Sequence, residues 1–273
     1  MEFHIHGARG SSPVSGPGFE RYGGHTSCYS SVLPGGRRLI LDCGSGLLHL
    51  RDEMTATEAD TPFDATVFLT HFHWDHIQGL PFFEPIYQRA SRIHFVAAPP
   101  EGMTIEAALD GAIRPPWFPV HFRDVAAQVT FEPLTDRPVL VGDVEVASAA
   151  LHHPGGVQGY RVTHGSHSLV LATDVEAGSP EGDEALRALA DGASVLIHDA
   201  QYTPDEWSGA RRGWGHSTWE QATGLAHDAR VRRLVLTSHD PRRSDDDVDE
   251  IVRAARSRFA ETEAAFSGQV IEF

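Results

Sequence analysis

The sequence contains only two cysteines and no apolar run long enough to cross a membrane. A spanning helix needs about 20 consecutive apolar residues, so we expect no membrane segment. Cys28 and Cys43 do not form a CxxC pair, which favours two buried thiols over a disulfide framework. The first residues, 1–6, lack the basic and apolar regions of a signal peptide. These absences together predict a cytoplasmic protein.

Basic residues are also scarce. The chain has 22 Lys and Arg against 38 Asp and Glu, a formal net charge of −16. Nucleic-acid binding needs basic side chains that displace counterions from phosphates, and residues 81–132 contain no lysine and four arginines. The charge therefore argues against nucleic acid as a partner, but it is compatible with a small anionic substrate held by local groups.

The 273 residues, of which 41% are hydrophobic, suffice for a large α/β fold, predicted as one domain over residues 1–273. The first half is rich in strand patterns, and strands alternate with helices in the second half. Expected strands cover 2–6, 30–33, 38–42, 65–70, 92–98, 125–134, 139–150, 159–162, 168–174, 194–200 and 233–240. Expected helices follow the glycine-rich turn at 44–46 and cover 106–112, 184–190, 217–229 and 248–259.

The stretch "LTHFHWDHIQGL" at residues 69–80 concentrates His71, His73, Asp75 and His76 directly after an apolar strand. Imidazole and carboxylate groups suit zinc and similar divalent ions. Histidines two apart on an extended loop can reach one ion, and the adjacent Asp-His pair offers ligands to a second. A solvated polar loop is the other interpretation, but the density of ligands favours metal.

Three further apolar strands end in a charged or imidazole side chain, at Asp174, Asp199 and His239. Layered α/β folds build their sites where strands end and loops begin. We therefore expect these residues to converge with the histidine cluster.

With these motifs the sequence resembles the metallo-β-lactamase superfamily, and within it the phosphodiesterase branch that includes ribonuclease Z and small cyclic-phosphate phosphodiesterases. The motifs occur in order along the chain: "GARGSSP", "YGGHTSCY", "HFHWDH", "HHPGGVQGY", "LATD", "LIHDAQY", "GHSTWEQA" and "LTSHD". The resemblance implies an α/β fold, a four-layer αββα sandwich. It also implies two divalent ions, zinc or manganese, at one edge of the sheets, and a homodimer.

The resemblance implies seven metal ligands in two groups that share one carboxylate. His71, His73 and His153 would hold one ion; Asp75, His76 and His239 would hold the other; and Asp174 would touch both. The spacing to Gly159-Tyr160 favours His153 over His152, which is expected to be a partly exposed neighbour.

Two of the motifs favour a phosphodiesterase over other members of the superfamily. Cleavage of a phosphodiester expels an alkoxide, which benefits from an acid at the leaving oxygen. We predict that His216 is this acid, that Asp199 orients it, and that Asp75 is the third catalytic residue. A lactamase lacks this pair, and the basic residues expected of a glyoxalase-like thioesterase do not stand out. Residues 217–220 read as a helix capping box, so Ser217 is predicted to be structural.

Some positions and functions stay open. The branch commonly has Asn where this chain has His25, and Arg9 and Ser11 contact either a substrate phosphate or only their own loop. The predicted function is hydrolysis of a small phosphodiester, such as a cyclic nucleotide or cyclic phosphate. The alternatives are a ribonuclease Z-like tRNA 3′ endonuclease, which the missing basic insert disfavours, and a metal-binding sensor without turnover, which the filled ligand positions disfavour.

Overall fold

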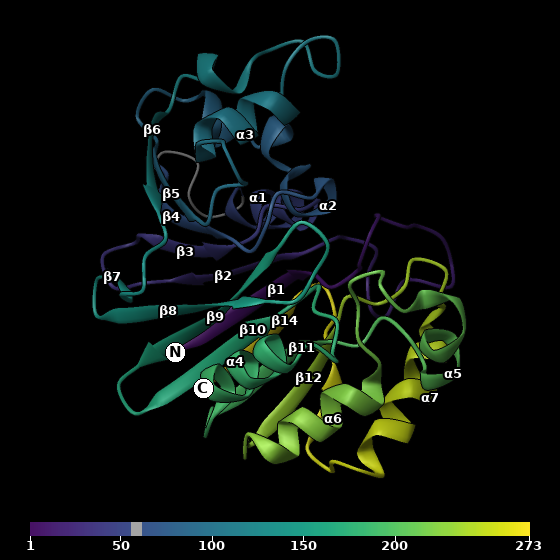
Figure 1. The fold of residues 1–273 in the computed structure, drawn as a ribbon. Helices are drawn as coiled ribbons and strands as arrows, with labels where there is room; N and C mark the ends of the chain where they lie inside the picture. Colours follow the sequence, from purple (N-terminus) through teal and green to yellow (C-terminus); the bar gives the residue numbers. More distant parts are fainter. Residues whose placement is uncertain (56–61) are drawn as a thin grey trace.

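Two sheets of seven strands form the centre of the protein, and helices cover their outer faces (Figure 1). The computed structural model describes residues 1–55 and 62–273. The strands of the first sheet are, in spatial order, β14 (Gln269–Glu272), β1 (Glu2–Gly7), β2 (Cys28–Val32), β3 (Arg38–Leu41), β4 (Asp64–Leu69), β5 (Arg92–Ala97) and β6 (Gln128–Pro133). Strands β3 to β6 run parallel to one another, and the other pairs are antiparallel.

The second sheet repeats this arrangement. Its strands are, in spatial order, β13 (Thr262–Ala264), β12 (Arg233–Thr237), β11 (Val195–Asp199), β10 (His167–Ala172), β9 (Val157–His164), β8 (Val144–Leu151) and β7 (Val139–Val141). Strands β10 to β13 are parallel, so their carboxyl ends meet at one edge. The helices are α1 (Gly46–Thr55), α2 (Trp74–Ile77), α3 (Ile105–Ala112), α4 (Pro180–Ala190), α5 (Pro204–Glu206), α6 (Trp219–Asp228) and α7 (Asp245–Arg256).

Three hydrophobic clusters separate four layers. The facing sides of the sheets share one core, to which Phe68 contributes from β4 and Tyr160 from β9. A second cluster joins the outer face of the first sheet to α1 and α3, and a third joins the outer face of the second sheet to α4, α6 and α7. Strands buried on both faces read as continuous apolar runs, as residues 65–69 do. The predicted αββα sandwich is confirmed.

Several local expectations were wrong. The strand expected over 139–150 is two strands, β7 and β8, which pair across a turn at Gly142. Strands β13 and β14 were missed, because segments this short carry no periodic signal and are strands only through pairing with β12 and β1. The capping box is shifted by one residue: Thr218 caps α6 together with Gln221, while the Ser217 hydroxyl donates to the Val175 carbonyl.

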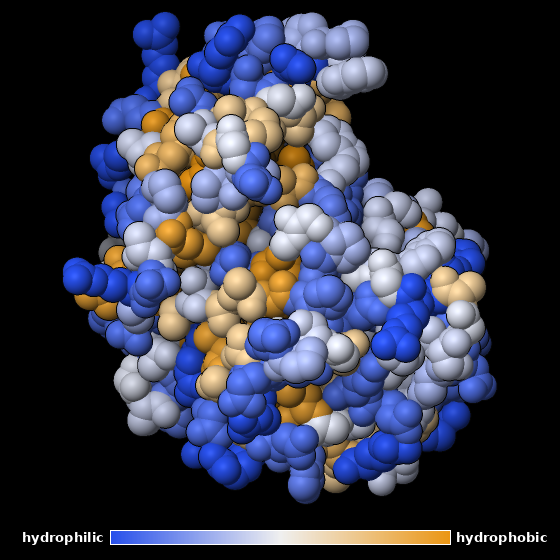
Figure 2. Space-filling view, viewed as in Figure 1, coloured by the Kyte–Doolittle hydropathy of each residue, from blue (hydrophilic) through white to orange (hydrophobic). Residues whose placement is uncertain are grey.

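The surface is mixed in polarity. On the face drawn in Figure 2, hydrophobic residues gather over the upper part and the middle, while hydrophilic residues dominate the lower right, where α6 and α7 lie in Figure 1. None of the helices built from the described residues is long and apolar enough to cross a membrane.

Candidate metal centre

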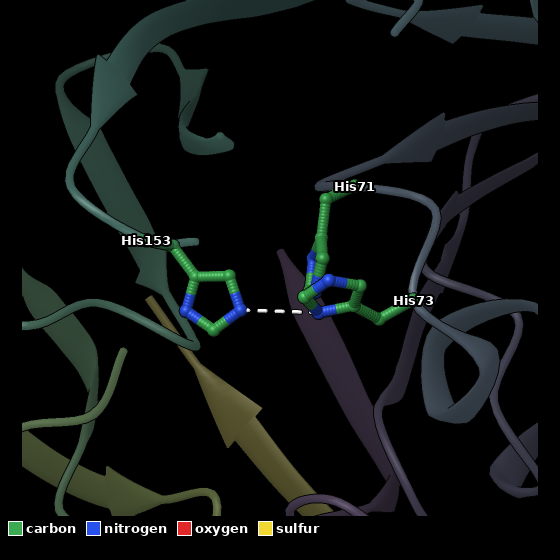
Figure 3. Close-up of side chains that lie close together, drawn as sticks. All are labelled: His71, His73 and His153. Atoms are coloured by element: carbon green, nitrogen blue, oxygen red, sulfur yellow. Dashed lines mark hydrogen bonds between the residues drawn. The ribbon is translucent and has the colours of Figure 1, made fainter. Parts of the chain in front are cut away.

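Three imidazoles meet at the edge where the two sheets end (Figure 3). His71 and His73 follow β4, His153 follows β8, and one ring nitrogen of each lies within 4.8 Å of the others. The closest pair is His73 Nδ1 and His153 Nε2, 3.1 Å apart. In Figure 3 the ring of His153 faces the other two from the opposite side. The structure therefore brings together the first predicted ligand group.

Two members of the second predicted group, Asp75 and His76, meet beside it. His76 Nε2 lies 3.3 Å from Asp75 Oδ2 and 3.3 Å from Asp174 Oδ2. Asp174 Oδ2 also lies 3.9 Å from His71 Nε2, so this carboxylate faces both groups. That is the position expected of a ligand shared by two ions.

Hydrogen bonds on the far side of the rings fix which nitrogen of each ring faces into the cluster. His153 Nδ1 donates to the Gly215 carbonyl at 2.7 Å, and His76 Nδ1 donates to Asp42 Oδ2 at 2.7 Å. His71 Nδ1 lies 3.0 Å from the Thr70 hydroxyl. A proton held at Nδ1 leaves the lone pair of His153 on Nε2, which is the arrangement typical of metal-bound histidines. Burial alone would lower the pKa of His76, but the carboxylates of Asp174, Asp75 and Asp42 outweigh it and hold this pKa well above its ordinary value, so a bound cation would displace the proton at Nε2.

The orphaned nitrogens test whether a metal fits. His71 Nε2 and His76 Nε2 are buried, and no hydrogen-bond partner for either occurs in the described part of the chain. Leaving such an atom unsatisfied costs about 1–3 kcal/mol. Burial and the neighbouring His76 hold the pKa of His71 well below its ordinary value, so His71 is the neutral form that binds metal. The residues therefore fit divalent ions of the zinc class.

Asp42 was not predicted, and it holds this cluster together. Its buried carboxylate accepts hydrogen bonds from Ser27 Oγ, from the Thr70 backbone and hydroxyl, and from His76 Nδ1. It links the end of β3 to the loop after β4. In the sequence Asp42 is only a single Asp after an apolar strand, and no motif indicates that it contacts His76.

His239 is not where the sequence analysis expected it. Its Nε2 donates to the Ala265 carbonyl at 2.9 Å, and its ring packs against Tyr22. Within residues 1–55 and 62–273, no potential ligand group includes it. The preceding residue, Ser238, contacts the cluster instead, because its hydroxyl lies 3.3 Å from Asp174 Oδ1. The cluster thus assembles six of the seven predicted ligands.

His216 and Asp199 form a buried pair beside the ligands. His216 Nδ1 donates to Asp199 Oδ2 at 2.7 Å, and one oxygen of Asp174 lies within 4.8 Å of both. Burial alone would lower the pKa of His216, but the carboxylates of Asp199 and Asp174 outweigh it and raise this pKa to about 9. The imidazole therefore carries its proton near neutral pH.

The backbone of the loop before His216 lies very close to the His153 ring. Gly215 has φ +87°, and a Cβ there would lie 2.3 Å from His153 Nδ1, so a side chain has no room. The carboxylate of Glu176 accepts the backbone N–H groups of Gly213 and Gly215. Glu176, which was also not predicted, thereby fixes the loop that carries the Gly215 carbonyl, which His153 contacts, and His216.

The open positions have structural contacts. Arg9 is 1% exposed and donates to the carbonyls of Gly23 and Arg243, so it supports its own loop rather than a substrate. The Ser11 backbone N–H donates to Asp75 Oδ2. His152 is exposed, as expected of the neighbour of His153.

A cavity of about 380 Å³ lies against His71 and His73. Its other walls come from residues 98–101 after β5 and from residues 150–151 and 155–158 around the β8–β9 turn. These walls are mainly apolar, contain one acidic residue, Glu101, and include no arginine among the residues described. The cavity offers space beside the metal ligands for a small molecule.

Replacing Asp42 with Asn is expected to weaken binding of the ion beside His76 by about 10–100-fold, because this carboxylate orients a ligand from behind. Metal affinity is measured by competition with a chelator. Ser27→Ala is the matched control, since it removes one hydrogen bond to Asp42 and leaves His76 paired. Equal affinity in the Asp42 variant and the wild type would contradict the orienting role.

Comparison with known proteins places this geometry in a family. The family described as the beta-lactamase superfamily domain matches residues 37–239. Ribonuclease Z of Bacillus licheniformis is 26% identical over 83% of this chain and 86% of its own length. The human short-form tRNase Z structure superimposes with a TM-score of 0.70 at 19% identity, covering 100% of this chain and 99% of its own. A diphosphatase of the PhnP family superimposes with a TM-score of 0.72 at 19% identity, covering 100% and 97%. The chain therefore belongs to the beta-lactamase superfamily, as its sequence motifs predict.

Proposed function

We propose that this protein is a metal-dependent hydrolase of small phosphodiesters. The observation that carries the proposal is the His216–Asp199 pair, which places a hydrogen-bonded imidazole beside the ligand cluster. The matched relatives support the reaction class, since one is named ribonuclease Z and another a diphosphatase.

Six residues make up the proposed ligand set. His71, His73 and His153 would hold one ion, Asp75 and His76 would hold the other, and Asp174 would be available to both. The first group, with three imidazoles, suits zinc, whereas the carboxylates of the second also suit manganese. When bound, the ions would supply an activated water and stabilise negative charge at phosphorus. Ser238 adds only a hydroxyl where a seventh ligand was expected, so the second ion is held by fewer strong ligands.

His216 supplies the proton for the leaving group. Its Nδ1 is engaged by Asp199, so Nε2 is the nitrogen from which a proton passes to a departing alkoxide. Asp199 is itself fixed, because its other oxygen accepts the backbone N–H groups of Gln201 and Ser217. A donor held this firmly requires no reorganisation during the reaction.

The size and polarity of the cavity indicate the substrate class. Its volume of about 380 Å³ fits a small molecule, and among the residues described its lining contains no arginine that could bind a polynucleotide backbone. A diester carries a single negative charge, which the bound ions would balance. The net charge of −16 also favours a small substrate over a polynucleotide, because it repels a polyanion.

A ribonuclease Z-like tRNA 3′ endonuclease is the second candidate. The observation that favours it is the similarity to ribonuclease Z over most of the chain. A sensor that binds metal without turnover is the third. It shares the ligand cluster, but it has no use for a paired imidazole such as His216.

The metal-loaded protein is expected to hydrolyse a cyclic nucleotide or bis-p-nitrophenyl phosphate with a kcat/KM far above that for a pre-tRNA. Parallel assays with nitrocefin test lactam opening, which we expect to be absent. Efficient trimming of the pre-tRNA would reverse the ranking in favour of the endonuclease, and inactivity on every substrate would favour the sensor.

A further inference from the structure

A second group of ligand-type side chains lies where α1 packs on β1, and it shares no residue with the metal centre. His6 comes from β1, and His49 and Glu53 come from successive turns of α1. One potential ligand atom of each lies within 4.8 Å of the others. Nothing in the proposed hydrolysis uses these residues.

The spacing of the three residues matches a metal site. His6 Nδ1 lies 3.5 Å from His49 Nδ1 and 3.5 Å from Glu53 Oε2, and His49 Nδ1 lies 3.4 Å from Glu53 Oε1. With zinc–ligand distances of about 2.0–2.1 Å, the edge of a ligand tetrahedron is about 3.3–3.4 Å. The two ring nitrogens fit one such edge, and each of them faces a different oxygen of the Glu53 carboxylate. Two ring nitrogens that face each other can share only one proton, whereas a cation satisfies both lone pairs.

Burial and hydrogen bonding present His6 as a ligand. The residue is 1% exposed, and its Nε2 lies 2.8 Å from the Ser30 hydroxyl, so the ring is fixed with Nδ1 toward α1. Burial, followed by the neighbouring His49, lowers the pKa of His6 to about 3, which keeps the imidazole neutral. The side chains of His49 and Glu53 are 32% and 44% exposed, so an ion and a water have access.

The surrounding residues add two more imidazoles and one cation. His25, at the position where the phosphodiesterase branch commonly has Asn, places its ring 6.1 Å from that of His49. His4 stacks on His6 with ring centroids 6.2 Å apart, and the Arg38 guanidinium also acts on His6. A ligand set of two imidazoles and one carboxylate favours zinc-class ions over calcium or magnesium, which prefer oxygen ligands.

We propose that His6, His49 and Glu53 bind a divalent transition-metal ion of the zinc class, with water at the fourth position. The ion would join α1 to β1, and it would act on stability because it binds only the folded arrangement. Since α1 begins shortly after Asp42, the site would also hold in place the segment that orients His76. This inference does not depend on the proposed hydrolysis.

The test is the zinc content of the full chain. His49→Ala and Glu53→Gln are expected to bind one zinc equivalent fewer than wild type after equilibration with zinc and removal of excess. Both residues are partly exposed, so the variants should fold, which circular dichroism checks. The matched control is His227→Ala, an exposed histidine on α6 beside Asp228, which should retain the full zinc content.

A second variant identifies the ligand directly. In cobalt-loaded His49→Cys, a thiolate-to-cobalt charge-transfer band is expected, and Glu53→Gln in the same chain should weaken it. Wild-type zinc content in His49→Ala, or no charge-transfer band in His49→Cys, would overturn the proposal. Either result would mean that the three residues only share protons with one another.

Discussion

Replacing His216 with Ala is expected to slow hydrolysis of a diester with an alkyl leaving group by about 10²–10⁴-fold, the usual cost of removing a positioned acid. A p-nitrophenyl diester should be slowed much less, because nitrophenolate departs without a proton. Measuring kcat/KM for both substrates isolates proton donation from binding and from the ions. Bound metal should be nearly unchanged, since six other side chains form the proposed ligand set.

Two variants control this result. His152→Ala removes an exposed imidazole near the same edge and should affect neither substrate. Asp199→Asn removes the negative charge that raises the pKa of His216. The acid acts only while protonated, so activity on the alkyl diester falls as pH rises through this pKa, and in Asp199→Asn that fall should begin at lower pH. Loss of metal from His216→Ala, or equal slowing of both substrates, would show that the residue is a ligand or a binding group.

Replacing Asp174 with Asn is expected to remove most of the bound metal and, with it, most of the activity. Burial alone would raise the pKa of Asp174, but the adjacent His76 and His216 outweigh this effect and hold it well below its ordinary value, so it is a carboxylate. Because its position faces both ligand groups, the loss should exceed the 10–100-fold typical of residues behind the ligands. Elemental analysis after dialysis measures the metal content.

The choice of Asn separates the metal effect from folding. Asp174 has φ +51°, a left-handed conformation that Asn tolerates better than Ala. Asp42→Asn, at φ +62°, is the matched comparison and should lose less metal. Full activity in metal-depleted Asp174→Asn would refute a metal-dependent reaction.

The sequence by itself determined the class of fold and predicted most of the proposed ligand cluster. His71, His73, Asp75 and His76 lie on one short loop after an apolar strand, so their proximity needs no information from elsewhere in the chain. The apolar runs of β4, β10, β11 and β12 predicted strands. Because each run ends in a charged or imidazole side chain, Asp174 and Asp199 were expected to converge with the histidine cluster.

Tertiary structure decided which way individual side chains point. His239 and Ser238 are adjacent, and only the local backbone, with φ +57° at Ser238, turns the hydroxyl toward Asp174 and the imidazole toward Ala265. The sequence pattern does not reveal whether residue 238 or residue 239 faces the site. The choice matters, because successive residues point in different directions.

Tertiary structure also decided which residues hold the site residues in position. Asp42 reaches His76 across 34 positions, Glu176 reaches Gly215 across 39, and His6 meets His49 across 43. Each is a single residue with no neighbouring pattern, so its role arises only when loops or elements from distant parts of the chain pack together. Whether a side chain can bind a metal ion depends on its residue type, so short motifs are enough to predict candidate ligands. Orientation and hydrogen-bond support depend on backbone angles and on contacts between distant segments, which no short motif contains.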